Sequence, residues 1–251
     1  MFKDFATDDG GDNLVELLAQ ARRLPFKEAL RECDEWLGPS VTASSRTTAI
    51  PRRESLRRVY RFPSDVYTPT DQECRDVQQM VETLVSDSSL WERIAKGRGW
   101  KPETIRQLAL ETYLGWRDSK LAFIYDTGIK LRWRCKGERI IRWAFGKPWL
   151  WRGAYLSIPT RTNVYITEGE PDCIALLDGG LEDDETRLAV ALPSSSTFDS
   201  SWARLFTGKH VVLCFDADDA GQKAVARVSS LLQGYAGSVR RLNWEGLRHA
   251  C

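Results

Sequence analysis

Two short apolar runs in the second half of the chain each end in a cluster of carboxylates, and this feature restricts the fold most strongly. Val164–Thr167 is followed by the letters EGEPD, and His210–Phe215 is followed by DADDAG. Short apolar runs bounded by turn residues are typical of buried β-strands. A helical pattern follows each run, through Ala175 and Leu177 in the first case and from about Gly221 to Leu232 in the second.

Two further runs, Arg187–Leu192 and Ser238–Leu242, complete a set of four predicted strands. Strands that alternate with helices form mostly parallel sheets. We therefore predict an α/β fold, with a mostly parallel sheet and flanking helices, for residues 158–251.

The residues before this region follow a different pattern. Residues 66–157 contain two helical segments, 70–95 and 102–111, and then short alternating runs around the turn Asp126-Thr127-Gly128. This order predicts a smaller, basic α+β subdomain with an antiparallel hairpin. Residues 1–38 form a predicted small helical segment that is broken at Pro25. Residues 39–65 are predicted to be a linker.

The composition excludes several classes of protein. The 251 residues contain 36 basic and 35 acidic side chains, six scattered cysteines without a CxxC pair, and two histidines. These counts argue against a zinc ribbon and a secreted disulfide scaffold. No apolar stretch approaches the ~18 residues of a membrane span, and the N-terminus lacks a signal-peptide pattern. We expect a cytoplasmic protein without zinc or membrane contact.

The basic charge is concentrated in residues 129–152, which contain eight basic residues and a single acidic one, Glu138. Tryptophans are interleaved with them. Lys and Arg pair with phosphates, and indole rings stack on unpaired bases for ~1–3 kcal/mol each. The predicted nucleic-acid and nucleotide-binding residues are Arg132, Arg134, Lys136, Arg139, Arg142, Lys147, Arg152, Trp149 and Trp151.

A competing interpretation places the tryptophans in the hydrophobic core. Strand alternation would put Arg132 and Arg134 on one face and Trp133 on the other. This favours a core position for Trp133, whereas both interpretations stay open for Trp149 and Trp151, near Pro148 and Gly153.

The carboxylates predict a cation site at the carboxyl ends of the strands, where ligands bind in α/β sheets. Asp216 and Asp218 are two residues apart, so an extended backbone directs both to the same side. Crowded carboxylates are stabilised by a cation, and oxygen ligands favour Mg²⁺ or Mn²⁺. Pairs of such ions assist phosphoryl transfer.

A structural interpretation of the acidic residues is also open. Asp218 or Asp219 can cap the following helix, where acids also suit the helix dipole. Glu170 and Asp178 are expected to be solvated.

The two motifs, VYIT-EGEPD and VVLCF-DADDAG, resemble the TOPRIM domain shared by bacterial-type primases, topoisomerases and some nucleases. The resemblance implies that Glu168 is a metal-assisting or acid/base carboxylate. It implies that Asp216 and Asp218 are the metal-binding DxD pair. Asp172 matches the acidic position that primases add, which makes Glu168 and Asp172 the candidate catalytic residues.

Two upstream stretches resemble primases in particular. RGWKPETIRQLALETYLGW and LAFIYDTGIKLRWR are similar to the first part of the primase catalytic core. DFATDDGGDNLVELLAQARRLPFKEALRECDEWLG resembles the tail of the primase zinc-binding module, but most of the module's zinc ligands would precede the chain. The chain also lacks the third acidic pair of primases, because its last strand is followed by LNWEGLRHAC with Glu245 as the nearby acid. This departure implies weak catalysis, a site completed by a partner, or a truncated chain.

The resemblance implies a primase-like nucleotidyltransferase that makes short primers on single-stranded DNA with Mg²⁺. Its partners would be the template, nucleoside triphosphates and a helicase or other replication protein of a phage or mobile element. The alternatives are a weakened single-strand-binding accessory module and a metal-dependent nuclease. The short chain has no room for the strand-passage domain of a topoisomerase.

Overall fold

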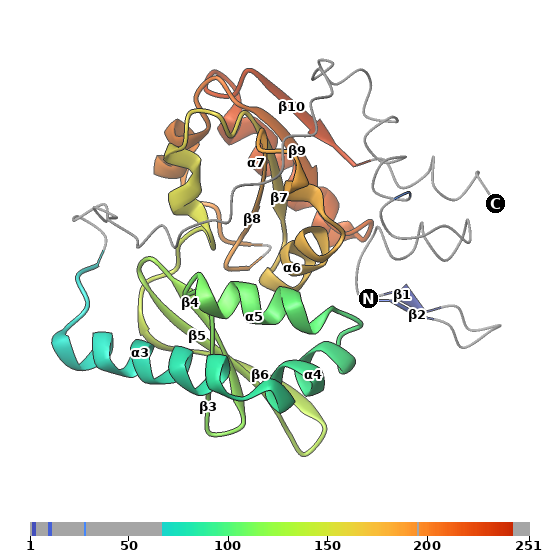
Figure 1. The fold of residues 1–251 in the computed structure, drawn as a ribbon. Helices are drawn as coiled ribbons and strands as arrows, with labels where there is room; N and C mark the ends of the chain where they lie inside the picture. Colours follow the sequence, from blue (N-terminus) through green and yellow to red (C-terminus); the bar gives the residue numbers. More distant parts are fainter. Residues whose placement is uncertain (1, 4–9, 12–27, 29–66, 195, 243–251) are drawn as a thin grey trace.

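The computed structural model describes residues 2–3, 10–11, 28, 67–194 and 196–242, which include two four-stranded sheets. The antiparallel sheet lies below the parallel sheet in Figure 1. The short strands β1 (Phe2–Lys3) and β2 (Gly10–Gly11) pair antiparallel. The predicted helical segment 1–38 and linker 39–65 fall almost wholly outside the described residues. Within these ranges, no helix has the length and apolar character needed to cross a membrane.

Within residues 67–194, three helices precede the antiparallel sheet: α3 (Asp71–Ser86), α4 (Ser88–Lys96) and α5 (Pro102–Leu110). The sequence predicted one helix over residues 70–95, but the helix is interrupted at Asp87. The Asp87 carboxylate accepts hydrogen bonds from the backbone N–H groups of Ser89 and Leu90 and so caps α4. A side chain that satisfies these free N–H groups favours a new helix start.

The antiparallel sheet consists of β3 (Leu114–Arg117), β4 (Lys120–Tyr125), β5 (Gly128–Cys135) and β6 (Glu138–Gly146), in that order. The predicted hairpin turn between β4 and β5 is confirmed. Helix α3 packs on one face of this sheet.

Close packing holds α3 on the antiparallel sheet. Met80 of α3 joins a small buried cluster with Ala122, Ile124 and Ile129. A Cβ atom on Gly115 would lie 2.8 Å from the Met80 Cβ, so only glycine allows this approach. The other face of β4 contributes its buried side chains to the main core.

The second sheet confirms the expected parallel arrangement. Its strands are β7 (Asn163–Thr167), β8 (Arg187–Ala191), β9 (His210–Cys214) and β10 (Ser238–Arg241), and all three neighbouring pairs are parallel. The helices between these strands are α6 (Glu170–Asp178), α7 (Asp219–Leu232) and the 3-10 helices η2 (Leu181–Asp183) and η3 (Ser200–Phe206). The 3-10 helix η1 (Gly153–Ser157) lies before β7, between the two sheets in the sequence.

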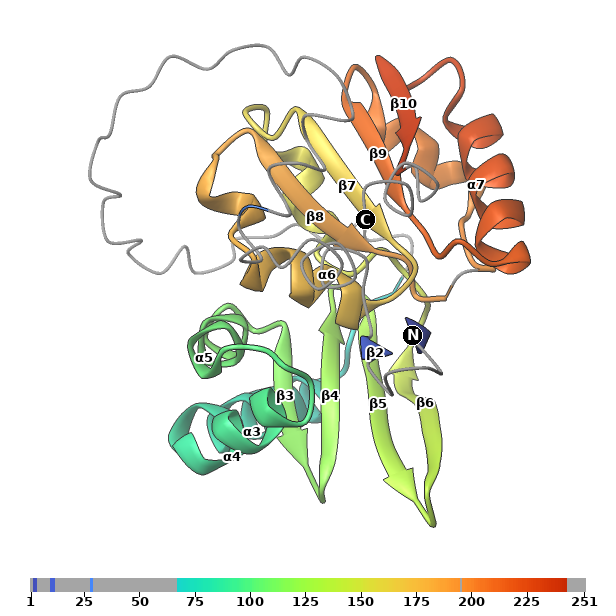
Figure 2. The ribbon, with the colours of Figure 1, turned by 90° about the vertical axis from the view of Figure 1, so that its right-hand side faces the viewer.

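The strand order β10-β9-β7-β8 creates a switch point between β7 and β9. From β7 the chain passes through α6 to β8 at one edge, and from β9 it passes through α7 to β10 at the other edge. The two connections diverge at the carboxyl ends of β7 and β9, and such a divergence leaves a crevice in which α/β proteins bind ligands. The topology alone therefore locates the candidate site (Figure 2).

One hydrophobic core joins the two sheets. Trp151 packs edge to face on Tyr113 and Phe123, with ring centroids 5.6 and 6.1 Å apart. Its backbone also exchanges hydrogen bonds with Ala191 at the end of β8. Because this core is continuous, the boundary between residues 157 and 158 stays a prediction.

A buried ion pair fixes the segment that leads from the antiparallel to the parallel sheet. Arg152 has a left-handed backbone conformation (φ 61°), and its guanidinium donates two hydrogen bonds to the Glu182 carboxylate, at 2.6 and 2.9 Å. The Arg152 side chain is 3% exposed and that of Glu182 is 11% exposed. Burial raises the pKa of Glu182, but Arg152 outweighs this effect, so the pKa lies below its usual value.

We predict that Glu182→Gln lowers the free energy of unfolding by about 3–5 kcal/mol, because it leaves a buried guanidinium without a counter-charge. Urea unfolding at pH 7 measures this loss. The exposed change Glu185→Gln is the control and should cost less than about 0.5 kcal/mol.

The same variant has a predicted pH signature. A lowered folded-state pKa means that Glu182 contributes its stability above the unfolded-state pKa of about 4.3 and loses it as the pH falls through the folded-state value. The difference in stability between wild type and Glu182→Gln should therefore shrink below about pH 4. A difference that stays constant as the pH falls would contradict the assignment.

Candidate active site

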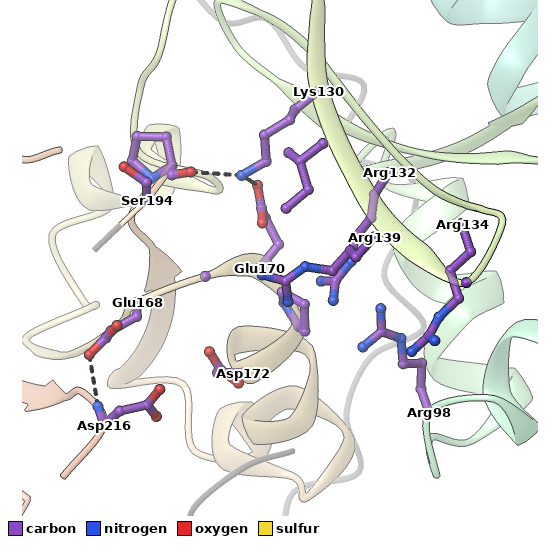
Figure 3. A pocket seen from close by; sticks show the side chains of 15 residues that line it. Arg98, Lys130, Arg132, Arg134, Arg139, Glu168, Glu170, Asp172, Ser194 and Asp216 are labelled. Atoms are coloured by element: carbon purple, nitrogen blue, oxygen red, sulfur yellow. Dashed lines mark hydrogen bonds and ion pairs between the residues drawn. The ribbon is translucent and has the colours of Figure 1, made fainter. Parts of the chain in front are cut away.

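A cleft of about 620 Å³ separates the carboxyl edge of the parallel sheet from the β5–β6 hairpin (Figure 3). Its two walls have opposite charge. The acidic wall includes Glu168, Asp172 and Asp216. The basic wall, which we call the arginine wall, consists of Arg98, Arg132, Arg134 and Arg139.

The acidic wall is built at the switch point. Glu168 directly follows β7, and its Oε1 accepts a hydrogen bond of 2.8 Å from the backbone N–H of Asp216, after β9. Asp172 lies in the first turn of α6. Parallel pairing of β7 with β9 thus brings together three of the carboxylates that the sequence identified, from segments more than forty residues apart.

Asp218 has a structural role as well. Its Oδ1 accepts a hydrogen bond of 2.7 Å from the Gly221 N–H and caps α7. The capping interpretation is therefore confirmed for Asp218, which is exposed and does not line the cleft. One of its carboxylate oxygens is occupied by the cap.

The carboxylates of the acidic wall oppose one another's ionisation. Desolvation, followed by repulsion from Asp216, Glu168 and Glu170, raises the pKa of Asp172 to about 7. Desolvation and the charges of Asp216 and Asp218 raise the pKa of Glu168. Desolvation and Asp218 also raise the pKa of Asp216. A bound cation would favour the ionised form of all three carboxylates and so counteract both the desolvation and the mutual repulsion.

The donor set of the acidic wall fits a magnesium or manganese ion. In the part of the chain that the structure describes, no three Asp, Glu, His or Cys side chains gather into a ready-made metal cage. Mg²⁺ is commonly held by one or two carboxylates, with waters and substrate phosphates as its other ligands. Glu168 and Asp216, linked by the hydrogen bond described above, fit this open type of site.

The arginine wall follows from strand alternation. Arg132 and Arg134 both face the cleft, as their spacing on β5 predicted. On β6, Ile141 lies opposite Arg132 and Arg139 lies opposite Arg134, and these two residues line the cleft as well. Arg98 reaches the same space from the connection between α4 and α5 (Figure 3).

Three other predicted basic residues lie outside the cleft. Arg142 pairs with Leu131 across the β5–β6 ladder, so it points to the face opposite Arg132. Lys136 is exposed in the hairpin turn, and Lys147 is exposed after β6.

Burial corrects the assignment of the remaining three. Trp149, Trp151 and Arg152 are 8%, 0% and 2% exposed. Trp149 packs on Trp202, with ring centroids 5.4 Å apart. These three residues therefore do not belong to the candidate interface, because buried rings cannot stack on bases and a buried, paired guanidinium cannot reach a phosphate.

The expectation that Glu170 and Asp178 are solvated is wrong. Glu170 is 3% exposed and forms an ion pair with Lys130, at the floor of the cleft. Asp178 accepts hydrogen bonds from the N–H of Lys101, at 2.9 Å, and from the hydroxyl of Thr104, and so links α6 to α5. Both acids connect the two halves of the described chain, which a local sequence pattern does not show.

Sequence reasoning also missed Gly221. A Cβ atom at this position would lie 2.1 Å from the Asp216 carbonyl oxygen and 2.8 Å from the Glu168 Oε1. The first turn of α7 therefore packs directly on the two strand-end acids. The available signal was the glycine that follows the acidic motif DADDA within a helical pattern.

Comparison with known proteins finds a family similar to the domain that carries the acidic wall. Residues 165–247 match the family model described as Toprim-like. The matched span includes Glu168, Asp172, Asp216 and Asp218, and with the parallel sheet it supports a TOPRIM-type fold. TOPRIM domains occur in enzymes that act on nucleic acids, and they generally bind Mg²⁺. No curated protein matches the chain.

We predict that Gly221→Ala weakens Mn²⁺ binding by tenfold or more, because the added methyl group must displace the Asp216 carbonyl and the Glu168 carboxylate. Overpacking of this kind typically costs about 1–3 kcal/mol of stability. Calorimetric titration with Mn²⁺ measures the affinity, and thermal unfolding shows whether the variant is folded.

The control is Lys223→Ala, an exposed change on the same helix. It should leave the Mn²⁺ affinity within about twofold. Equal Mn²⁺ affinities for Gly221→Ala and wild type would show that these acids do not form the ion site.

Proposed function

We propose that the chain is a primase-like nucleotidyltransferase that joins nucleotides into short primers on single-stranded DNA. The observation that carries the proposal is the cleft in which the arginine wall faces the carboxylates of a TOPRIM-type sheet. Joining nucleotides requires both parts, cations for the substrate phosphates and carboxylates for the metal ion.

The arginine wall would bind the phosphates of the template and of the incoming triphosphate. Guanidinium groups form paired hydrogen bonds with phosphate oxygens. Ile141 lies between the arginines and offers an apolar contact for a base. Lys136 and Lys147 are exposed near this surface and remain candidates for further phosphate contacts.

The acidic wall would bind the metal. Glu168 and Asp216, with the free oxygen of Asp218, would hold Mg²⁺ or Mn²⁺. When bound, such an ion neutralises charge on the reacting phosphate. Asp172 stands beside these acids with a pKa of about 7, so its carboxylate is suited to accept the proton of the attacking 3′-hydroxyl.

In this mechanism the protein contributes mainly by positioning and by charge. The 3′-hydroxyl attacks the α-phosphate, and pyrophosphate leaves as the new phosphodiester forms. The arginine wall stabilises the negative charge that develops on the leaving group. Holding both reactants in one cleft lowers the entropic part of the barrier. A helicase or another replication protein would bring the chain to its template.

A second candidate function is a single-strand-binding replication accessory module. It is favoured by the absence of a three-carboxylate cluster in the described ranges. Such a module would keep the arginine wall and bind DNA without joining nucleotides.

We predict that the double variant Asp216→Ala, Asp218→Ala abolishes nucleotide incorporation on single-stranded DNA, because it removes two of the three metal-binding carboxylates. Labelled nucleotide incorporation with Mg²⁺ or Mn²⁺ measures the effect, and the loss should exceed a hundredfold. The double variant Glu92→Ala, Glu103→Ala, which removes two exposed acids from α4 and α5, is the control for net charge.

The other outcomes of this assay identify the alternatives. A wild-type protein that binds single strands but incorporates nothing would support the accessory module. A wild-type protein that shortens the DNA would support a nuclease. Activity that survives in the Asp216, Asp218 double variant would place the chemistry elsewhere.

We also predict that Arg134→Ala, Arg139→Ala weakens single-strand binding and its salt dependence. Each phosphate that the protein no longer neutralises should lower the slope of log K against log salt by about 0.7, so two such phosphates should lower it by about 1.4. Fluorescence anisotropy at several salt concentrations measures both quantities. The matched control is Arg142→Ala on the opposite face of the hairpin, and a slope change of the same size per residue there would contradict the arginine wall.

A further inference from the structure

Three polar side chains are buried at the floor of the cleft, where the two sheets meet. Lys130 of β5 forms an ion pair with the carboxylate of Glu170, the first residue of α6. The Tyr125 hydroxyl, from β4, donates a hydrogen bond to the same carboxylate. The side chains of Lys130 and Glu170 are 6% and 5% exposed. We call these three residues the floor cluster.

The floor cluster reaches two turns of the parallel sheet. Glu170 is two residues from Glu168, in the turn after β7. The Lys130 Nζ also donates a hydrogen bond of 2.7 Å to the Pro193 carbonyl, in the segment that follows β8. One ammonium group from the antiparallel sheet therefore holds two strand ends of the other sheet (Figure 3).

The same strand carries the arginine wall. From Lys130 onward, every second residue of β5 points to the cleft, and these residues are Lys130, Arg132 and Arg134. Successive residues on one strand face are about 6.6 Å apart. Fixing Lys130 on Glu170 therefore fixes the backbone positions from which Arg132 and Arg134 extend, relative to the acid Glu168.

Energetics argue for a role beyond stability. Burying two charges costs desolvation energy that their attraction roughly offsets, and apolar side chains of similar size commonly serve stability as well or better. Burial and the Glu170 charge raise the pKa of Tyr125 well above its usual value, so its hydroxyl remains a hydrogen-bond donor. The floor cluster thus fixes the relative positions of β5 and α6, although it adds little to the free energy of unfolding compared with apolar side chains.

We propose that Lys130 is a positioning residue that, through Glu170, holds the arginine wall and the metal-binding carboxylates at the separation that a metal-bound nucleoside triphosphate spans. The inference rests on the proposed function, since it assumes that a triphosphate bridges the two walls. Lys130 acts through Glu170 and Pro193 and does not touch the reacting atoms.

The test uses the double variant Lys130→Met, Glu170→Gln, which removes both charges and keeps similar side-chain volumes. Titration calorimetry measures the affinity for a non-hydrolysable nucleoside triphosphate analogue with and without Mn²⁺. In the wild type, Mn²⁺ should tighten nucleotide binding by tenfold or more, because one ligand contacts both walls. In the double variant this coupling should fall to less than about threefold, and kcat for incorporation should fall at least tenfold.

The matched control is Lys209→Met. Lys209 is a second buried lysine, 9% exposed, whose Nζ donates a hydrogen bond of 2.7 Å to the Arg161 carbonyl and which does not line the cleft. This variant should lose stability and keep the coupling. Thermal unfolding of all variants separates loss of folding from loss of positioning.

The outcomes distinguish the two proposals. Wild-type coupling without nucleotide incorporation would overturn the proposed function, while the double variant would still test the positioning role. Coupling that is the same in the wild type and the folded double variant would overturn the positioning role. Absence of coupling in the wild type would overturn it too, because no ligand would then bridge the walls.

Discussion

Parallel pairing between β7 and β9 is the constraint on which the site depends. These neighbouring strands end in register, with Thr167 opposite Cys214, so the residues that follow them meet at one edge of the sheet. The chain diverges there toward opposite edges, which leaves the crevice open. The Glu168 carboxylate then accepts the Asp216 N–H, and Gly221 allows α7 to begin directly against both residues. Backbone topology and one glycine thus hold together carboxylates that repel each other.

The antiparallel sheet supplies the opposite charge. Because β5 directs alternate residues to one face, Lys130, Arg132 and Arg134 follow one another along the cleft. The first is buried and paired with Glu170, and the next two line the cleft. Burial therefore falls along the strand, from the internal ion pair of Lys130 through the half-buried Arg132 to the exposed Arg134. A chain with a net charge of +1 presents this basic wall because the acids that balance it lie elsewhere, some of them on the opposite side of the cleft.

Local patterns predicted the secondary structure and the acidic wall well. Each predicted strand of the parallel sheet is present within one residue at either end, because short apolar runs bounded by turns have few other solutions in an α/β chain. The pairing of Glu168 with Asp216 followed from strand ends that share an edge. The break at Asp87 was missed, because a capping side chain in an otherwise helical pattern carries a weak signal.

For the basic segment, residues 129–152, the sequence could not show which of the basic side chains are exposed. The sequence analysis assigned Arg152 to the binding surface and counted Lys130 among the basic residues of 129–152. Both are buried in ion pairs, Lys130 with Glu170 and Arg152 with Glu182. Both partners lie thirty or more residues away, so no local pattern could identify them. A sequence shows how many basic residues a segment contains. Which of them are exposed depends on the acidic partners that the fold brings to them. The arginines that remain in the cleft lie opposite Glu168, Asp172 and Asp216. If one ligand contacts both walls, as the proposed function requires, then the spacing between the walls matters more than the number of charges on either.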